Sequence, residues 1–361
     1  MINQAKRALL LALVLTGLRL SAAAQTVSVP VENDFTIRDF RFESGETLPA
    51  LKLHYRTLGT PSKDATGRVR NAVLILHGTG GTGAQFLSRQ FAGVLFGPGQ
   101  LLDAARYYLI MPDGIGHGRS SKPSDGLRMR FPRYNYDDMV SAHHRLLTEH
   151  LGVNHLRLVM GTSMGGMQTW VWGERYPEFM DALMPLASLP VQIAGRNRML
   201  RRMIMDSIKS DPEWNRGEYQ TQPLRGLTAA AYGLLVMTSS PLQMQQQAPT
   251  REEADRQFES RVRASIENRD ANDMLYQFDA SRDYNPSPKL DRIQAPLVAI
   301  NSADDQVNPP ELGIAEREIQ RVKRGRFILI PISDQTRGHG THSLPELWKQ
   351  HLAALLKESA E

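Results

Sequence analysis

The sequence predicts an α/β fold in which helices flank a mostly parallel central sheet and a helical cap is inserted late in the chain. Short apolar runs recur along the chain and end in glycine or polar residues, as is typical of strands buried on both faces. Helical patterns separate these runs, and such alternation requires a mostly parallel sheet covered on both sides. Between about 190 and 290 the apolar runs stop and only the helical pattern continues, which indicates the cap.

The predicted strands start with a hairpin. Residues 35–58 contain two strand-like runs joined through a turn at Ser44 and Gly45. The buried strands that follow are predicted at 72–77, 107–114, 156–161, 182–188, 296–301 and 326–331.

A helix is predicted before the third of these buried strands. Asn135 can cap its first turn, Asp138 stands at the position that completes a reciprocal cap, and Gly152 ends the helical pattern. We interpret the three histidines of this segment as residues on the helix surface: His143, His144 and His150.

The order of the elements divides the chain into four parts. Residues 1–24 are predicted to be a signal peptide, and residues 25–189 the first part of the α/β core. Residues 190–290 are predicted to form the helical cap insertion, and residues 291–361 the second part of the core.

The signal peptide is predicted from the order of charge, apolarity and small residues. Lys6 and Arg7 precede an apolar run, and small residues lead to a cleavage position after Ala24. The alternative is a membrane-tethered or buried N-terminal helix, but the apolar run is too short to span a bilayer. We therefore expect a periplasmic or secreted protein that is not stably inserted in a membrane after cleavage.

The composition excludes several classes of function. The 361 residues contain no cysteine, so disulfides, thiolate metal sites and cysteine nucleophiles are excluded. Three of the 43 basic residues lie in the predicted signal peptide, so 40 basic against 38 acidic residues leave a formal charge of +2. This small charge, without a basic stripe, predicts no nucleic-acid partner. Neither zinc-ligand spacing nor a dinucleotide-binding glycine motif occurs, so we expect no metal and no cofactor.

The motif Gly161-Thr162-Ser163-Met164-Gly165 is the strongest indication of chemistry. It matches G-x-S-x-G and lies between a predicted strand and a predicted helix, which is where a nucleophilic serine is held in a strained turn. The flanking glycines let neighbouring backbone pass without a Cβ clash. A chance Gly-Ser-Gly turn is the alternative.

A nucleophilic serine needs a base, and the base needs an orienting acid, each expected after a later strand. Asp304 and Asp305 are the acid candidates, and His339 and His342 are the base candidates. We favour His339 because glycines flank it on both sides, whereas His342 is predicted to lie where the last helix begins. The pattern does not separate the two aspartates.

Two backbone N–H groups are predicted to stabilise the oxyanion of a tetrahedral intermediate. Met164, directly after the serine, supplies the first, and Thr79 in the loop "HGTGGTG" (77–83) supplies the second. The alternative for this loop is a phosphate cradle, but the lysine of that motif is absent.

With these residues identified, the chain resembles an α/β-hydrolase and, within that superfamily, the homoserine O-acetyltransferases. The segments "FRFESGETL" and "LHYRTLGT" are similar to that family's opening hairpin, and "GTSMGGMQTW" to its serine turn. "NRMLRRMI", "RDANDMLY" and "DDQVNPPE" are similar to its later segments. The resemblance implies Ser163 as nucleophile, His339 as base and Asp305 as acid.

The resemblance also implies a substrate-binding pair in the cap. The family's asparagine and arginine fall on Asn197 and Arg201, and the arginine is expected to hold a substrate carboxylate through its fork of donors. Without the resemblance, Arg196, Arg198, Arg201 and Arg202 would indicate a solvated cationic face. A homodimer is expected by analogy with the family.

Three features depart from the family. Gly340 follows the histidine where the family typically has an aspartate that can meet a substrate amine, and the loops "HGTGG" and "DGIGHGRSS" are closer to esterases. Export would also separate the enzyme from acetyl-CoA. We therefore expect a serine-dependent acyl hydrolase acting on a small ester or acyl substrate, with an O-acyltransferase using a small hydroxyl acceptor as the alternative. A binding protein on an inactive scaffold is a third possibility, which the complete set of catalytic residue types disfavours.

Overall fold

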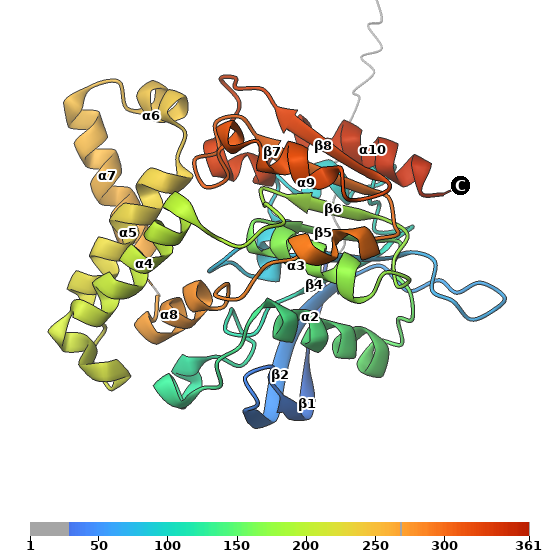
Figure 1. The fold of residues 1–361 in the computed structure, drawn as a ribbon, viewed down its shortest axis with the longest axis horizontal. Coiled ribbons are helices and arrows are strands. Elements are labelled where there is room, and N and C mark those ends of the chain that lie inside the picture. Colours follow the sequence, from blue (N-terminus) through green and yellow to red (C-terminus); the bar gives the residue numbers. More distant parts are fainter. Residues whose placement is uncertain (1–28, 268, 361) are drawn as a thin grey trace, which may run out of the picture.

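The computed structural model describes residues 29–267 and 269–360, so the predicted signal peptide, residues 1–24, lies outside the described residues. The described chain forms one eight-stranded sheet in the order β1-β2-β4-β3-β5-β6-β7-β8 (Figure 1). The strand bounds are β1 Val31–Arg41, β2 Thr47–Leu58, β3 Ala72–Leu76, β4 Tyr108–Pro112, β5 Leu158–Thr162, β6 Leu183–Leu186, β7 Leu297–Ser302 and β8 Gly325–Ile330.

Most of the sheet is parallel, as the sequence predicts. β1 and β2 form the predicted antiparallel hairpin, and β2 also runs antiparallel to β4. Every later pair along the sheet is parallel. The predicted fold class is therefore confirmed. Because β3 to β8 are parallel, their carboxyl ends meet at one edge of the sheet, and the loops that carry the candidate site residues lie there.

Helices cover both faces of the sheet. The described helices are α1 Ala92–Leu95, α2 Tyr136–Arg145, α3 Met164–Arg175, α4 Gly195–Ser210, α5 Leu224–Thr238, α6 Pro241–Gln247, α7 Arg251–Ile266, α8 Ala271–Asp279, α9 Ile314–Ile319 and α10 Lys349–Glu358. The core on one face includes side chains of α2, α3 and α9, and the core on the other includes side chains of α1 and α10. Within β3, Leu74 belongs to the first core while Val73 and Ile75 belong to the second, which explains the unbroken apolar run.

The helix α2 begins with the predicted cap. The Asn135 side chain accepts from the Asp138 N–H at 2.9 Å, and the Asp138 carboxylate accepts from the Asn135 N–H at 2.9 Å. A π-helical turn, Leu146–His150, extends α2 toward Gly152, whose φ of 62° ends it. The surface interpretation is wrong for His143, which is only 2% exposed. His143 lies one turn after Met139 and one turn before Leu147, so it faces the core with them.

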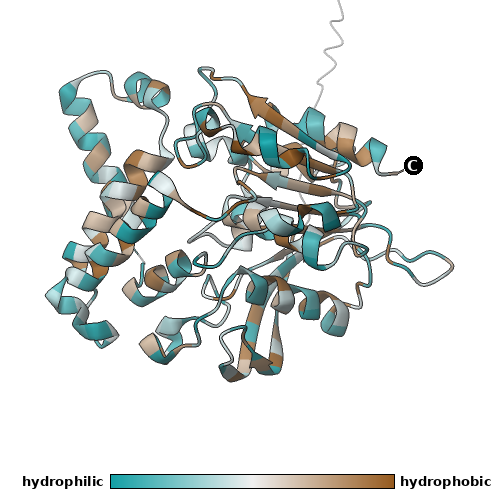
Figure 2. Ribbon diagram, viewed as in Figure 1, coloured by the Kyte–Doolittle hydropathy of each residue, from teal (hydrophilic) through white to brown (hydrophobic). Residues whose placement is uncertain are grey.

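Between β6 and β7 the described residues contain no strand. The helices α4 to α8 occupy this segment and lie to one side of the sheet in Figure 1. Part of the segment has its own apolar core, which includes Leu200, Ile204, Leu227 and Met274. Figure 2 shows mostly hydrophilic residues along α6 and α7 and more hydrophobic ones in the strands. Within the described residues, no helix combines the length and apolarity needed to cross a bilayer.

Candidate active site

Ser163 lies in the sharp turn between β5 and α3. Its φ of 55° and ψ of −113° are a conformation that a residue with a side chain rarely adopts. A Cβ added to Gly161 would come within 2.2 Å of the Gly165 carbonyl oxygen, and one added to Gly165 within 2.0 Å of the Leu76 carbonyl oxygen. Both glycines are therefore required for the turn that exposes the serine hydroxyl.

A chain of hydrogen bonds joins Ser163 to His339 and Asp305. The His339 Nε2 lies 2.8 Å from the Ser163 Oγ, and its Nδ1 lies 2.9 Å from the Asp305 Oδ2. His339 and Asp305 are both buried, and the other carboxylate oxygen of Asp305 accepts the Val307 and Asn308 N–H groups. Three residues predicted from separate loops thus lie together, with His339 within hydrogen-bond distance of both Ser163 and Asp305.

The acid of this chain is held in its charged form. Burial raises the pKa of Asp305, but the charge of His339 and hydrogen bonds from His339, Asn308 and the Val307 backbone outweigh it, so the pKa lies below its usual value. An ionised Asp305 accepts a hydrogen bond from the His339 Nδ1–H and so keeps the proton of the neutral ring on Nδ1. The Nε2 is then free to accept the Ser163 proton.

The two alternative residues lie nearby but are bonded differently. Asp304 accepts the Gly338 N–H at 2.9 Å and the Ser302 hydroxyl, so it anchors the loop that carries His339. The predicted position of His342 is wrong: it shares a 3-10 helix with His339, Gly338–Ser343, and α10 starts only at Lys349. Burial and the neighbouring His339 charge lower the pKa of His342 to about 3, which leaves its imidazole neutral.

The predicted oxyanion donors lie on two backbone segments beside the serine. Met164 is the first residue of α3, where N–H groups have no partner within the helix. Thr79 lines the same cavity as Ser163, and a Cβ on its neighbour Gly78 would stand 3.4 Å from the Ser163 Cβ. In the described part of the chain, neither N–H donates to a backbone carbonyl. Both are available to a substrate oxygen.

His77, which the sequence reasoning did not single out, links two loops below this site. Its Nε2 accepts the Gly114 N–H at 2.9 Å, so the proton must sit on Nδ1, which donates to the Gly78 carbonyl at 2.8 Å. Burial lowers the pKa of His77 and keeps it neutral. The Gly78 carbonyl and the Thr79 N–H belong to one planar peptide and point in opposite directions. Hence His77 orients the Thr79 N–H.

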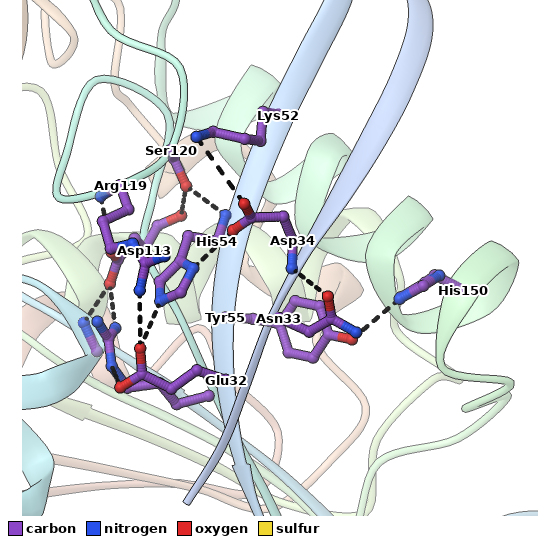
Figure 3. Close-up of polar contacts among 12 residues, drawn as sticks. Glu32, Asn33, Asp34, Lys52, His54, Tyr55, Asp113, Arg119, Ser120 and His150 are labelled. Carbon is purple, nitrogen blue, oxygen red and sulfur yellow. Dashed lines mark hydrogen bonds and ion pairs between the residues drawn. The ribbon is translucent and has the colours of Figure 1, made fainter.

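The far end of the same loop is held by a buried carboxylate. Asp113 is fully buried and accepts the Gly83 N–H and the Arg56 guanidinium, each at 2.8 Å. Arg56 also donates to Glu32 of β1 at 3.1 Å, and Figure 3 shows Glu32 and Asp113 among the polar side chains beside the hairpin. Asp113 is the first residue of the loop "DGIGHGRSS". The glycines of this loop indicate that it lies near a site, but the sequence pattern does not identify Gly83 and Arg56 as the partners of Asp113.

A cavity of about 220 Å3 opens beside Ser163 and His339. Asn197 and Arg201 of α4 line it, and Arg201 is only 5% exposed. The Arg201 guanidinium donates to the Asn197 side-chain oxygen and to the Ser281 hydroxyl oxygen, each at 3.0 Å. The solvated-face interpretation therefore fails for Arg201, although Arg196 and Arg202 are exposed.

The charged side chains that line this cavity in the described structure are all positive. Among the described residues that line it are two guanidinium groups, Arg201 and Arg269, and no aspartate or glutamate. A larger, mostly apolar cavity of about 400 Å3 lies on the other side of Asn197 and Val307, and neither Ser163 nor His339 lines it. No group of three or more metal-ligating side chains lies close together in the described ranges.

Comparison with known proteins agrees with this architecture. Residues 71–330 match the family described as alpha/beta hydrolase fold. A probable acyltransferase of Methanothermobacter thermautotrophicus is 32% identical over 77% of this chain and 84% of its own length. A homoserine O-acetyltransferase of Pelobacter propionicus is 31% identical over 87% of this chain and 92% of its own.

Solved structures share the fold. A homoserine O-acetyltransferase from Bacillus anthracis superposes with a TM-score of 0.80 at 20% identity, covering 91% of this chain and 98% of its own. An acetylester hydrolase from Corynebacterium glutamicum gives a TM-score of 0.77 at 22% identity, covering 91% and 96%. One scaffold therefore carries both transferases and hydrolases among its neighbours.

Proposed function

The chain belongs to the α/β-hydrolase family and resembles the homoserine O-acetyltransferases within it, and on this premise we propose that it is an exported serine-dependent acyl hydrolase. The observation that carries the proposal is the hydrogen-bond chain from Asp305 through His339 to Ser163, beside a cavity. Its substrate is a small ester, because the cavity is small.

The proposed reaction has two halves. Ser163 attacks the carbonyl carbon while His339 Nε2 takes the hydroxyl proton, and the oxyanion accepts the N–H groups of Thr79 and Met164. The C–O bond to the alcohol breaks, and the alcohol leaves with the proton from His339. Water then attacks the acyl-enzyme in the same way, which releases the acid and restores Ser163.

Water is the proposed acceptor because of the charge in the cavity. An amino-acid acceptor needs a carboxylate to hold its ammonium group, and Gly340 stands where the transferases typically have one. The described lining contains no other carboxylate that could substitute. A transferase must hold its acceptor more tightly than water, so the missing partner favours hydrolysis.

The second candidate is an O-acyltransferase that uses a small hydroxyl acceptor. Two observations favour it: the names of the relatives, and the buried Arg201 beside Asn197 in the cavity, which suits a carboxylate on the acceptor. An exposed cationic face would not present such a group.

A partition assay separates the two candidates. Purified protein starting at Gln25 receives a chromogenic acetyl ester with and without homoserine, and acetate is counted against acetyl-homoserine. We expect acetate alone, at a rate that homoserine does not change. Acetyl-homoserine as the main product would contradict hydrolysis and favour the second candidate. Ser163→Ala, folded by circular dichroism, should release neither product.

Export and assembly are further parts of the proposal. Cell fractionation of the full chain should find the protein, shortened by the predicted signal peptide, outside the cytoplasm. For assembly, the cap helices carry large exposed apolar side chains: Met199, Met203, Tyr232, Val236 and Phe258. A homodimer through the cap would cover them, and light scattering should give twice the chain mass; a monomer would contradict it.

A further inference from the structure

The second guanidinium of the cavity, that of Arg269, has no partner among the residues that the structure describes. Arg269 lies before α8 and lines the cavity with Ser163. It is half-buried, and among the described residues its side chain makes no hydrogen bond or ion pair. Burial lowers its pKa. A partly desolvated charge without a partner is costly, so its retention points to a ligand that supplies the missing acceptors.

Arg269 lies against the loop that follows β3. A Cβ added to Gly80 would come within 2.3 Å of its Nη1, so the glycine leaves room for the guanidinium. The charge of Arg269 also contributes to lowering the pKa of His117, in the loop after β4, although burial is the larger cause. Arg269 therefore lies above the ends of β3 and β4.

The sheet order fixes the side of Ser163 on which this charge lies. Ser163 follows β5, and β3 and β4 lie on one side of that strand. β7 and β8 lie on the other side and carry Asp305 and His339 in the loops after them. Arg269 and His339 thus face the nucleophile from opposite sides.

This geometry separates the two halves of an ester. The alcohol oxygen must lie near the His339 Nε2 to receive its proton, and the carbonyl oxygen must face the N–H groups of Thr79 and Met164. The acyl chain must therefore extend to the side of Ser163 that is away from His339, and Arg269 lies on that side. We propose that Arg269 binds a carboxylate on the acyl chain, so that the preferred substrates are monoesters of small dicarboxylic acids. This inference rests on the proposed function.

The chemistry of the residue suits that role. A guanidinium offers a planar fork of donors that matches a carboxylate, and it stays charged at every pH of interest. Arg201, with two of its contacts already made to Asn197 and Ser281, lies on the cap helix α4 and is separate from this role. The cavity of about 220 Å3 limits the acyl chain to a short one.

The test compares two esters of equal length. The 4-nitrophenyl monoester of adipic acid and 4-nitrophenyl hexanoate differ in a terminal carboxylate against a methyl group. Wild type, Arg269→Gln and Arg269→Lys are assayed for kcat/KM, with Arg202→Gln as control, because Arg202 is an exposed arginine of α4. We expect wild type to prefer the adipate monoester and Arg269→Gln to lower that preference by about 10- to 100-fold. Arg269→Lys should be intermediate and Arg202→Gln should match wild type.

Equal wild-type rates on the two esters, or an equal loss on both in Arg269→Gln, would overturn the inference while leaving hydrolysis intact. A third ester, 4-acetoxybenzoate, carries its carboxylate on the leaving group; if Arg269→Gln affects this ester as strongly as the adipate monoester, the assignment to the acyl side is wrong. Calorimetric binding of monomethyl adipate to Ser163→Ala is independent of turnover. Binding that Arg269→Gln abolishes would support the inference even if hydrolysis failed, and no binding would overturn it.

Discussion

The orientation of the Thr79 peptide by His77 gives the sharpest prediction. The two ring nitrogens have separate partners: Nδ1 donates to the Gly78 carbonyl, and Nε2 accepts the Gly114 N–H. His77→Asn keeps a donor near the Nδ1 position and loses the Nε2 acceptor. His77→Gln keeps an acceptor near the Nε2 position and loses the Nδ1 donor. The pair of variants therefore separates orientation of the peptide from anchoring of the second loop.

The two variants are expected to change different quantities: His77→Gln should lower kcat, and His77→Asn should lower the free energy of unfolding. Loss of a whole oxyanion donor costs about 100- to 1,000-fold in kcat. His77→Gln should cost less, about 10-fold, because the Gly78 carbonyl keeps a second hydrogen bond from the Gly81 N–H at 3.0 Å. His77→Asn leaves the Gly114 N–H without its acceptor, so it should lower the free energy of unfolding by about 1–3 kcal/mol with kcat nearly unchanged.

The assay is hydrolysis of a chromogenic acetyl ester, with urea unfolding on the same preparations. A lower kcat in His77→Gln at unchanged KM, together with lower stability in His77→Asn, would support the orienting role. If both variants lowered kcat equally, or if His77→Asn lost more, His77 would only support the loop and the reasoning would be refuted.

Three further predictions follow from the same contacts. Asp305→Ala should lower kcat by about 10,000-fold, whereas Asp304→Ala, which removes the acceptor of the Gly338 N–H and of the Ser302 hydroxyl, should lower it by about 10-fold; equal losses in the ester assay would mean that both carboxylates serve His339. Gly165→Ala should destabilise the fold by more than about 3 kcal/mol because its Cβ would meet the Leu76 carbonyl oxygen, while Gly93→Ala, whose Cβ meets only Arg89 at 3.6 Å, should be nearly neutral in urea unfolding. Burial lowers the pKa of His143 from 6.5 to about 3, so below pH 6.5 the unfolded chain takes up a proton that the folded chain does not, and stability falls. His143→Leu should therefore remove about 1.4 kcal/mol of the stability lost between pH 7.5 and pH 5.5, and identical losses in the two proteins would contradict this cause.

The strands and the serine turn could be predicted because their signals are local. A strand buried on both faces must be apolar at every position, as Val73 and Leu74 illustrate by packing into opposite cores. The turn at Ser163 needs glycine two residues before and after it, and those clashes involve backbone within the motif or the adjacent strand. Such requirements can be recognised in a short stretch of sequence.

The roles of His77, Asp113 and Arg269 could not be predicted because each depends on loops that are distant in the chain. His77 was seen only as the first residue of a glycine-rich loop, and its partner Gly114 follows a different strand. The wrong prediction at His143 has another cause: its spacing from Met139 places it on the buried face, whereas a polar side chain on a helix usually faces water.

The cap enters and leaves the sheet between neighbouring strands. Leu183 and Leu186 of β6 pair with Leu297 and Ile300 of β7 in parallel, so the insertion leaves at the carboxyl end of β6 and returns at the opposite edge of the sheet, at the amino end of the neighbouring strand. Every residue of the proposed Ser163, His339 and Asp305 set lies outside it. Helices α4 to α7 are therefore the replaceable part: another helical segment could be grafted in their place to change substrate choice, while α8, whose Tyr276 packs in the core of the sheet, and the reacting groups keep their positions. The graft cannot shrink to a hairpin turn, because a connection between parallel strands needs about a dozen residues or more.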